Sequence, residues 1–117
     1  MRVYVASKFE NPRAPEVAAQ LEAAGHTITY KWWGCSNFTQ EQALLDFYGV
    51  IHADALVLVV EDPALKYSGA ITEFGMALGR GIPVYLMGNA LDRNIFTLLP
   101  GVYRGIETLL QATASAI

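Results

Sequence analysis

The feature that most constrains the fold is an alternation of strand-like and helix-like segments that continues along the whole chain. The hydrophobic run Ala55–Val60 predicts a buried parallel strand, because strands covered on both faces are typically apolar throughout. A helix is predicted to follow from about Ser68 to Arg80, and Gly81 supplies its stop signal. Strands and helices that alternate in this way predict a parallel sheet with helices on both faces.

The other elements follow the same rule. Further strands are predicted at Arg2–Ala6, Thr27–Trp32, Pro83–Met87 and Val102–Tyr103, and further helices from Pro15, from about Gln40 to His52 and from Ile106 to Ala116, with a short helical turn at Phe96–Leu99. The fold class that fits is α/β, a small doubly wound parallel sheet of five strands in the flavodoxin-like (Rossmann-like) order 2-1-3-4-5.

The second helix has two further features. Thr39–Gln42 fits a capping box at its start. Its apolar residues at helical spacing are expected to form the buried stripe: Leu44, Leu45, Tyr48 and Ile51.

Length and composition narrow the class of protein. A chain of 117 residues suits one domain, which we expect to span residues 1–117. Because 53% of the residues are hydrophobic and 16% charged, part of the apolar surface is expected in the interface of a homodimer or higher homo-oligomer. The net charge of −3 argues against a nucleic acid polymer as partner.

Other classes are excluded by what the sequence lacks. The single cysteine, Cys35, cannot form an intrachain disulfide or a cysteine-based metal cluster, and it fits the reduced thiol of a cytoplasmic protein. No signal peptide or membrane-spanning run is visible, so we expect a cytoplasmic protein that does not bind a membrane.

The predicted strand order places a ligand crevice beside residues 6–12 and 61–69. The chain reverses direction between strands one and three, and ligands of such sheets bind outside the carboxyl ends of the strands. Glu73 lies beside this crevice among apolar neighbours such as Ile71 and Phe74, where an unpaired carboxylate is costly. We expect an ionised carboxylate, favoured by the helix macrodipole, that serves as a nucleophile. The alternative is a glutamate at a helix start that faces water.

Two more residues are candidates for the crevice. Asp46 is either a solvated acidic residue or, if its helix enters from above the sheet, part of the site. Tyr4 is either a core aromatic residue or a source of a hydroxyl near the carboxyl end of the first strand. Asp54 is expected to be a structural turn or cap residue. His26 and His52 are expected at helix ends as surface or cap residues, and no metal site is indicated.

Ligand-binding residues are indicated more weakly. Ser7, Lys8 and the pair Ser68–Gly69 could donate hydrogen bonds to a phosphate, with a helix amino terminus behind the second pair. Neither a Gly-x-Gly-x-x-Gly nor a Walker sequence is present. Either Trp32 or Trp33 could cover a planar ligand or fill an interface.

With Glu73, Asp46 and Tyr4 in these places, the sequence resembles the nucleoside 2-deoxyribosyltransferase family, which includes the 2′-deoxynucleoside 5′-phosphate N-hydrolases. The pattern Gly-x-x-x-Glu-x-Gly-x-Ala begins at Gly69. The similar segments cover nearly the whole chain: Val3–Ser7, Ala23–His26, Asp46 before Ala53-Asp54, Gly69–Ala77 and Asn94–Val102.

The resemblance implies a reaction and a role for each catalytic residue. Glu73 matches the nucleophile that attacks C1′ of the deoxyribose and forms a glycosyl-enzyme ester. Asp46 matches the acidic residue that assists departure of the nucleobase, and Tyr4 matches the tyrosine that orients the nucleophile. Two such carboxyl groups are what a retaining glycosyl transfer requires. Water as acceptor gives a hydrolase, and a second nucleobase gives a transferase.

The resemblance also implies the rest of the site. A small-molecule nucleoside or nucleotide would be bound without a cofactor or metal, in a dimer or higher assembly. The substrate-binding residues would be Ala6, Ser7, Lys8, Phe9, Trp33, Ser68, Gly69 and Asn94. Many transferases carry Asp where this chain has Tyr67, and the phosphate hydrolases place a serine in this loop, as Ser68 does here. The difference favours a nucleotide substrate. A non-catalytic nucleotide-binding module of the same fold is the alternative.

Overall fold

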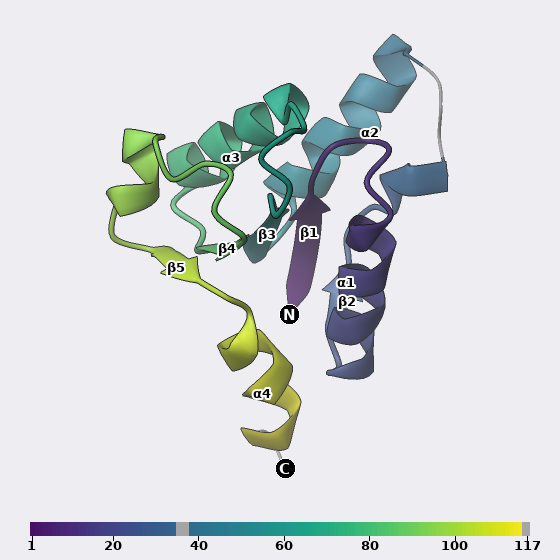
Figure 1. Ribbon diagram of the computed structural model, residues 1–117. Coiled ribbons are helices and arrows are strands. Elements are labelled where there is room, and N and C mark those ends of the chain that lie inside the picture. The colour runs from purple at the N-terminus through teal and green to yellow at the C-terminus, as the bar shows by residue number, and fades with distance from the viewer. Residues whose placement is uncertain (35–37, 116–117) are drawn as a thin grey trace.

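The computed structural model describes residues 1–34 and 38–115, with side chains up to residue 111. A five-stranded parallel sheet runs through its centre in the order β2-β1-β3-β4-β5 (Figure 1). This order confirms the predicted α/β doubly wound fold. The strands are β1 (Arg2–Ala6), β2 (Thr27–Ile28), β3 (Ala55–Val59), β4 (Val84–Met87) and β5 (Val102–Arg104). Cys35 lies outside the described residues.

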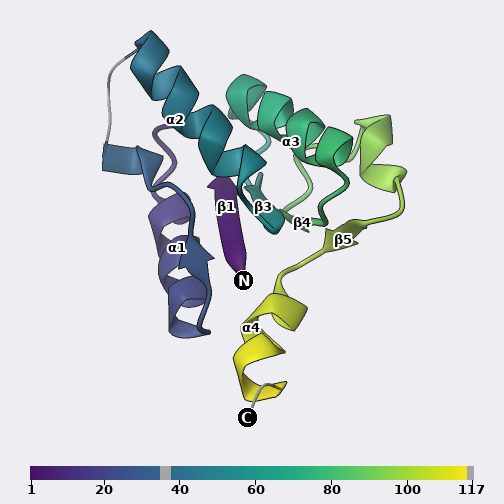
Figure 2. The ribbon, with the colours of Figure 1, turned by 180° about the vertical axis from the view of Figure 1, so that it is seen from behind.

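The helices cover the sheet from both faces. The α-helices are α1 (Arg13–Ala23), α2 (Gln40–Ile51), α3 (Ser68–Arg80) and α4 (Glu107–Ser115), and two short 3-10 helices are η1 (Trp32–Gly34) and η2 (Ile95–Leu98). Helices α2 and α3 contact each other on one face, and α1 and α4 contact each other on the other (Figures 1 and 2). Within the described residues, no helix is both long and apolar enough to cross a membrane.

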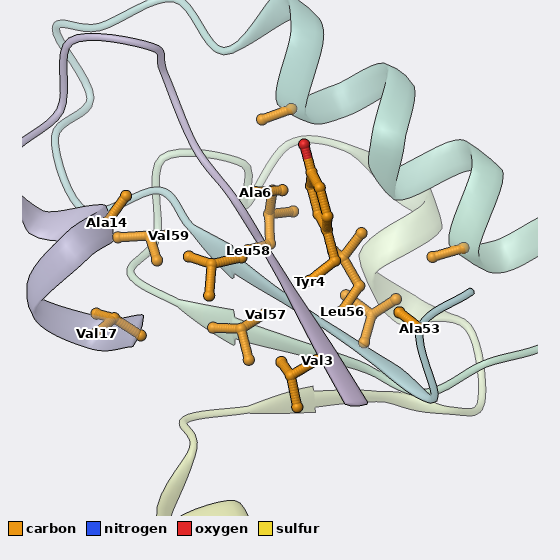
Figure 3. Packing of buried hydrophobic residues seen from close by; sticks show 14 of the residues in the cluster. Val3, Tyr4, Ala6, Ala14, Val17, Ala53, Leu56, Val57, Leu58 and Val59 are labelled. Carbon is orange, nitrogen blue, oxygen red and sulfur yellow. The ribbon is translucent and has the colours of Figure 1, made fainter. Parts of the chain in front are cut away.

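The core lies around the two central strands. Four of the five residues of β1 and all of β3 are buried, and Val3 and Val57 lie on the side of the sheet that faces α1 with its Ala14 and Val17 (Figure 3). Tyr4 points to the opposite face, which α2 and α3 cover (Figure 3). The ring of Tyr4 is thus part of the core, and its hydroxyl points out of the core toward Glu73.

Helix α2 does not bury the stripe that its apolar residues predicted. Leu44, Leu45 and Tyr48 are 45%, 41% and 50% exposed, and the buried residues of this helix are Gly49 and Val50. The physical reason is close contact with β1: a Cβ added at Gly49 would lie 2.8 Å from Cε2 of Tyr4. Because the glycine lets the helix approach the sheet on that side, the leucines face outward. The predicted cap is present, since the Thr39 hydroxyl accepts a hydrogen bond from Gln42 N at 3.2 Å.

Strand β2 is shorter than the predicted segment Thr27–Trp32. It ends at Ile28, and the chain then turns so that the Trp32 indole donates a hydrogen bond of 2.7 Å to the Val5 carbonyl. A side-chain donor therefore satisfies a β1 carbonyl that a longer edge strand would otherwise have paired.

The three polar residues predicted to be structural differ in their outcome. Asp54 accepts a hydrogen bond from Arg2 N at 2.8 Å, as expected of a cap residue. His52 is exposed and stacks on Tyr48. The surface position predicted for His26 is wrong: its ring is buried, 3.2 Å from the Met1 amine and 2.7 Å from the Leu109 carbonyl. Contact with α4 covers it.

Candidate active site

A cleft of about 440 Å³ opens where the strand order reverses between β1 and β3. This is the place where parallel α/β sheets bind ligands. Residues from β1 and the loop after it, from η1, from α2 and α3 and from the segments that precede these two helices contribute to its walls. They are Tyr4, Ser7, Lys8, Phe9, Trp32, Phe38, Gln42, Asp46, Lys66, Tyr67, Ser68, Gly69 and Glu73.

The tightest polar contact in the cleft joins Tyr4 and Glu73. The Tyr4 hydroxyl donates a hydrogen bond of 2.5 Å to Oε2 of Glu73. Burial and the neighbouring Glu73 carboxyl raise the pKa of Tyr4, so its hydroxyl remains a donor throughout the physiological range. Since the hydrogen bond occupies Oε2, Oε1 is the oxygen through which Glu73 could react.

Burial of Glu73 opposes the ionised form that the sequence led us to expect. Burial raises its pKa from 4.5 to about 8, the charge of Asp46 acts in the same direction, and the Tyr4 hydrogen bond opposes them. The helix macrodipole gives little help, because α3 begins at Ser68 and Glu73 lies beyond its first turn. The raised pKa therefore favours the protonated form of Glu73 at neutral pH.

Asp46 faces the same cleft from α2. It is half-buried, and the Gln42 amide donates a hydrogen bond of 3.0 Å to its Oδ1. Burial raises the pKa of Asp46, and the Gln42 hydrogen bond opposes this shift. The Asp46 charge also raises the pKa of both Glu73 and Tyr4. Asp46 thus acts electrostatically on both groups of the hydrogen-bonded pair Tyr4–Glu73.

Gly49 decides how closely α2 can approach these groups. A Cβ at this position would lie 2.8 Å from Cε2 of Tyr4 and 3.1 Å from Cβ of Tyr30, both closer than ordinary van der Waals contact. The Thr29 hydroxyl also donates a hydrogen bond of 2.7 Å to the Gly49 carbonyl. The position of α2, and with it that of Asp46, depends on a residue without a side chain.

The residues predicted to bind a phosphate differ in whether their polar groups already take part in hydrogen bonds. Ser68 and Gly69 begin α3, where the first backbone N–H groups of a helix have no partner within it. Lys8 and Lys66 add two cations to the cleft wall. Ser7, in contrast, donates to the Val59 carbonyl at 2.8 Å and accepts from Asn11, so its hydroxyl holds the loop in place.

Aromatic rings supply the apolar part of the cleft. The rings of Phe9 and Trp32 lie 6.4 Å apart, and the exposed Phe38 belongs to the same wall. Trp33 packs its ring edge against Trp32 at 5.3 Å and does not line the cleft. Of the two neighbouring tryptophans, it is Trp32 that lines the cleft.

Two more predicted binding residues do not line the cleft. Ala6 is fully buried in β1. Asn94 caps η2 by accepting a hydrogen bond of 3.0 Å from Phe96 N. Conversely, the sequence did not single out Phe38 and Gln42 as lining residues, whereas Lys66 and Tyr67 lie in the loop 61–69 that it placed beside the crevice. For Gln42 a signal was available, because a residue four positions before Asp46 shares its helix face.

No group of three or more His, Cys, Asp or Glu residues capable of holding a metal occurs in the part of the chain that the structure describes.

Comparisons with known proteins support the fold alone. No protein-family model and no curated protein matches the chain. A solved structure, described as that of a conserved protein from Enterococcus faecalis V583, is similar at a TM-score of 0.65 and 17% sequence identity. The similarity covers 100% of this chain and 99% of the other. The architecture is therefore shared over the full length of both chains.

Proposed function

We propose that the protein breaks the N-glycosidic bond of 2′-deoxynucleosides or their 5′-monophosphates, and hydrolyses or transfers the sugar, with Glu73 as nucleophile. The observation that supports this proposal is the convergence of Glu73, Asp46 and the Tyr4 hydroxyl in one cleft. At about 440 Å³ the cleft is within the range of small-molecule sites. The family resemblance of the sequence points to the same reaction.

The reaction would proceed by two displacements at C1′. Oε1 of Glu73 attacks C1′, the bond from C1′ to the base nitrogen breaks, and the base departs with a proton from Asp46. A deoxyribosyl ester of Glu73 remains. Water or a second base then attacks C1′, its proton returns to Asp46, and the Glu73 carboxylate is released.

The two carboxyl groups must share one proton for this sequence of steps. Asp46 has to carry it, and Glu73 has to be ionised. In the free protein Glu73 has a pKa of about 8, so the proton resides there at neutral pH. Positive charge that develops at C1′ favours the ionised form of Glu73, and the proton is then needed on Asp46. The mechanism therefore requires the singly protonated pair as the active form.

The rest of the substrate would be held by the remaining walls. A nucleobase would pack against the aromatic wall, where Phe9 is exposed and Trp32 lies beside it. A 5′-phosphate would lie at the start of α3, where the N–H groups after Tyr67 point outward and Lys66 supplies positive charge. This arrangement favours the monophosphate over the free nucleoside.

The oligomer expected from composition has a candidate surface. On the outer side of α2, four large apolar side chains are 39% to 50% exposed: Leu44, Leu45, Phe47 and Tyr48. We propose that copies of the chain associate through this face. Sedimentation velocity should show a dimer or larger species that Leu45→Glu converts to monomer. A monomeric wild-type protein would contradict the proposal.

The proposed activity is tested by measuring free base by chromatography after incubation with deoxynucleosides and with their 5′-monophosphates. Wild-type protein should release base, and Glu73→Gln should not. Glu41→Gln, an exposed glutamate at the start of α2, is the matched control and should retain full activity. Binding without base release from any substrate would instead support a non-catalytic nucleotide-binding module.

A further inference from the structure

Two polar side chains, those of Gln42 and Tyr30, are linked to Asp46 by hydrogen bonds. The Gln42 amide nitrogen lies 3.0 Å from Oδ1 of Asp46 and 3.2 Å from the Tyr30 hydroxyl. The Tyr30 hydroxyl is also 3.3 Å from the Gln42 amide oxygen. Gln42 is therefore held from one side by Tyr30 and holds Asp46 on the other.

The chemistry of an amide makes this contact directional. An amide NH₂ group donates hydrogen bonds and does not accept them, so Oδ1 of Asp46 must act as acceptor toward Gln42. When Asp46 is protonated, its proton is then placed on Oδ2. The spacing of four residues puts Gln42 and Asp46 on one face of α2, and both line the cleft.

We propose that Gln42 is a positioning residue that fixes the Asp46 carboxyl group through Oδ1, so that Oδ2 presents its proton to the departing base. The inference rests on the proposed function and deepens it. Gln42 need not touch the reacting atoms, since its effect on the reaction passes through Asp46. Loss of Gln42 should thus matter only where the leaving group needs a proton.

The test compares two leaving groups in three variants: Gln42→Leu, Asp46→Asn and the double variant. A purine 2-deoxyriboside releases a base that needs protonation, whereas p-nitrophenyl 2-deoxyriboside releases a stable anion. If wild-type protein requires a phosphate, both compounds are used as 5-phosphates. Gln42→Leu should lower kcat for purine release by about 10- to 100-fold, within the range of general-acid catalysis, and nitrophenol release by less than about threefold.

The double variant shows whether Gln42 acts through Asp46. If it does, adding Gln42→Leu to Asp46→Asn should cause no further loss in purine release. Gln40→Leu, an exposed glutamine on the same helix, is the matched control and should behave like wild type. Equal loss with both leaving groups, a further loss in the double variant, or a change confined to KM would overturn the inference.

A second measurement does not require activity. The carboxyl carbon of Asp46 can be titrated by NMR in wild-type protein and in Gln42→Leu. Because the Gln42 hydrogen bond lowers the pKa of Asp46, the variant should titrate at higher pH. An unchanged titration would show that the contact is not made. If wild-type protein releases neither base nor nitrophenol, the proposed function fails, whereas active protein with the wrong pattern refutes the role of Gln42 alone.

Discussion

The two walls of the cleft are built in different ways. Tyr4 and Glu73 belong to the first wall, and Tyr4 is 1% exposed in β1, between β2 and β3. Asp46 belongs to the second wall, on α2, whose large apolar side chains face outward. The first wall is therefore anchored in the core of the sheet through Tyr4, and the second depends on how one helix packs against the sheet. We infer that the nucleophile is fixed by the fold and the acid by local contacts of α2.

The largest expected effect distinguishes the catalytic roles of the two walls. Glu73→Gln should lower kcat/KM for base release by about 10⁴-fold or more, because no covalent intermediate can form. Asp46→Asn should cost about 10²- to 10³-fold, the usual range for loss of a general acid. Steady-state rates of base release measure both. A larger loss in Asp46→Asn than in Glu73→Gln would place the essential group on the α2 wall.

The pH dependence tests whether the walls share one proton. With a pKa of about 8 for Glu73, the pair loses its last proton as the pH rises through this value. Wild-type kcat/KM should then fall about tenfold per pH unit above that point, since no acid remains for the base. In Asp46→Asn this alkaline decline should disappear. A wild-type rate that rises through pH 8 to a plateau would show that Asp46 does not donate a proton.

The contact between the walls can be disturbed at Gly49. Gly49→Ala places a methyl group against the Tyr4 ring and should lower kcat by about tenfold as α2 or Tyr4 shifts. Gly79→Ala is the matched control, because a Cβ there meets nothing within 4 Å and alanine favours a helix by up to about 1 kcal/mol. Rates and thermal unfolding should be compared for both variants. Equal activity of the two would show that the close approach at Gly49 is unimportant.

The smallest expected effect concerns stability and the first wall only. The pKa of Glu73 is raised in the folded protein, so its contribution to stability is complete below about pH 4.5 and is lost as the pH rises through about 8. The free energy of unfolding of wild-type protein should therefore decrease by on the order of 1 kcal/mol per pH unit in this window. Glu73→Gln should flatten the decrease. Urea unfolding at several pH values measures it, and parallel curves for the two proteins would refute the raised pKa.

The sequence predicts the first wall well. The alternation of elements leads to the observed strand order, and α3 spans the predicted Ser68–Arg80. Because the order of parallel strands fixes where the chain reverses, Glu73 could be placed beside the cleft from topology.

The second wall is harder to predict because it depends on single contacts between distant residues. Periodicity assigned the leucines of α2 to the core, but close contact of Gly49 with Tyr4 turned them outward. The Trp32 indole replaces part of an edge strand by bonding the Val5 carbonyl, which no pattern of residue types reveals. Likewise, the raised pKa of Glu73 follows from burial in the folded protein.

The most direct test of the central claim is detection of the covalent intermediate. Wild-type protein is mixed with a 2′-deoxynucleoside 5′-monophosphate, quenched with acid within milliseconds to seconds, and measured as intact protein and as peptides by mass spectrometry. The mechanism predicts an added mass equal to the deoxyribosyl phosphate, located on Glu73 and absent from Glu73→Gln. Base release without any adduct, together with undiminished base release by Glu73→Gln, would contradict it.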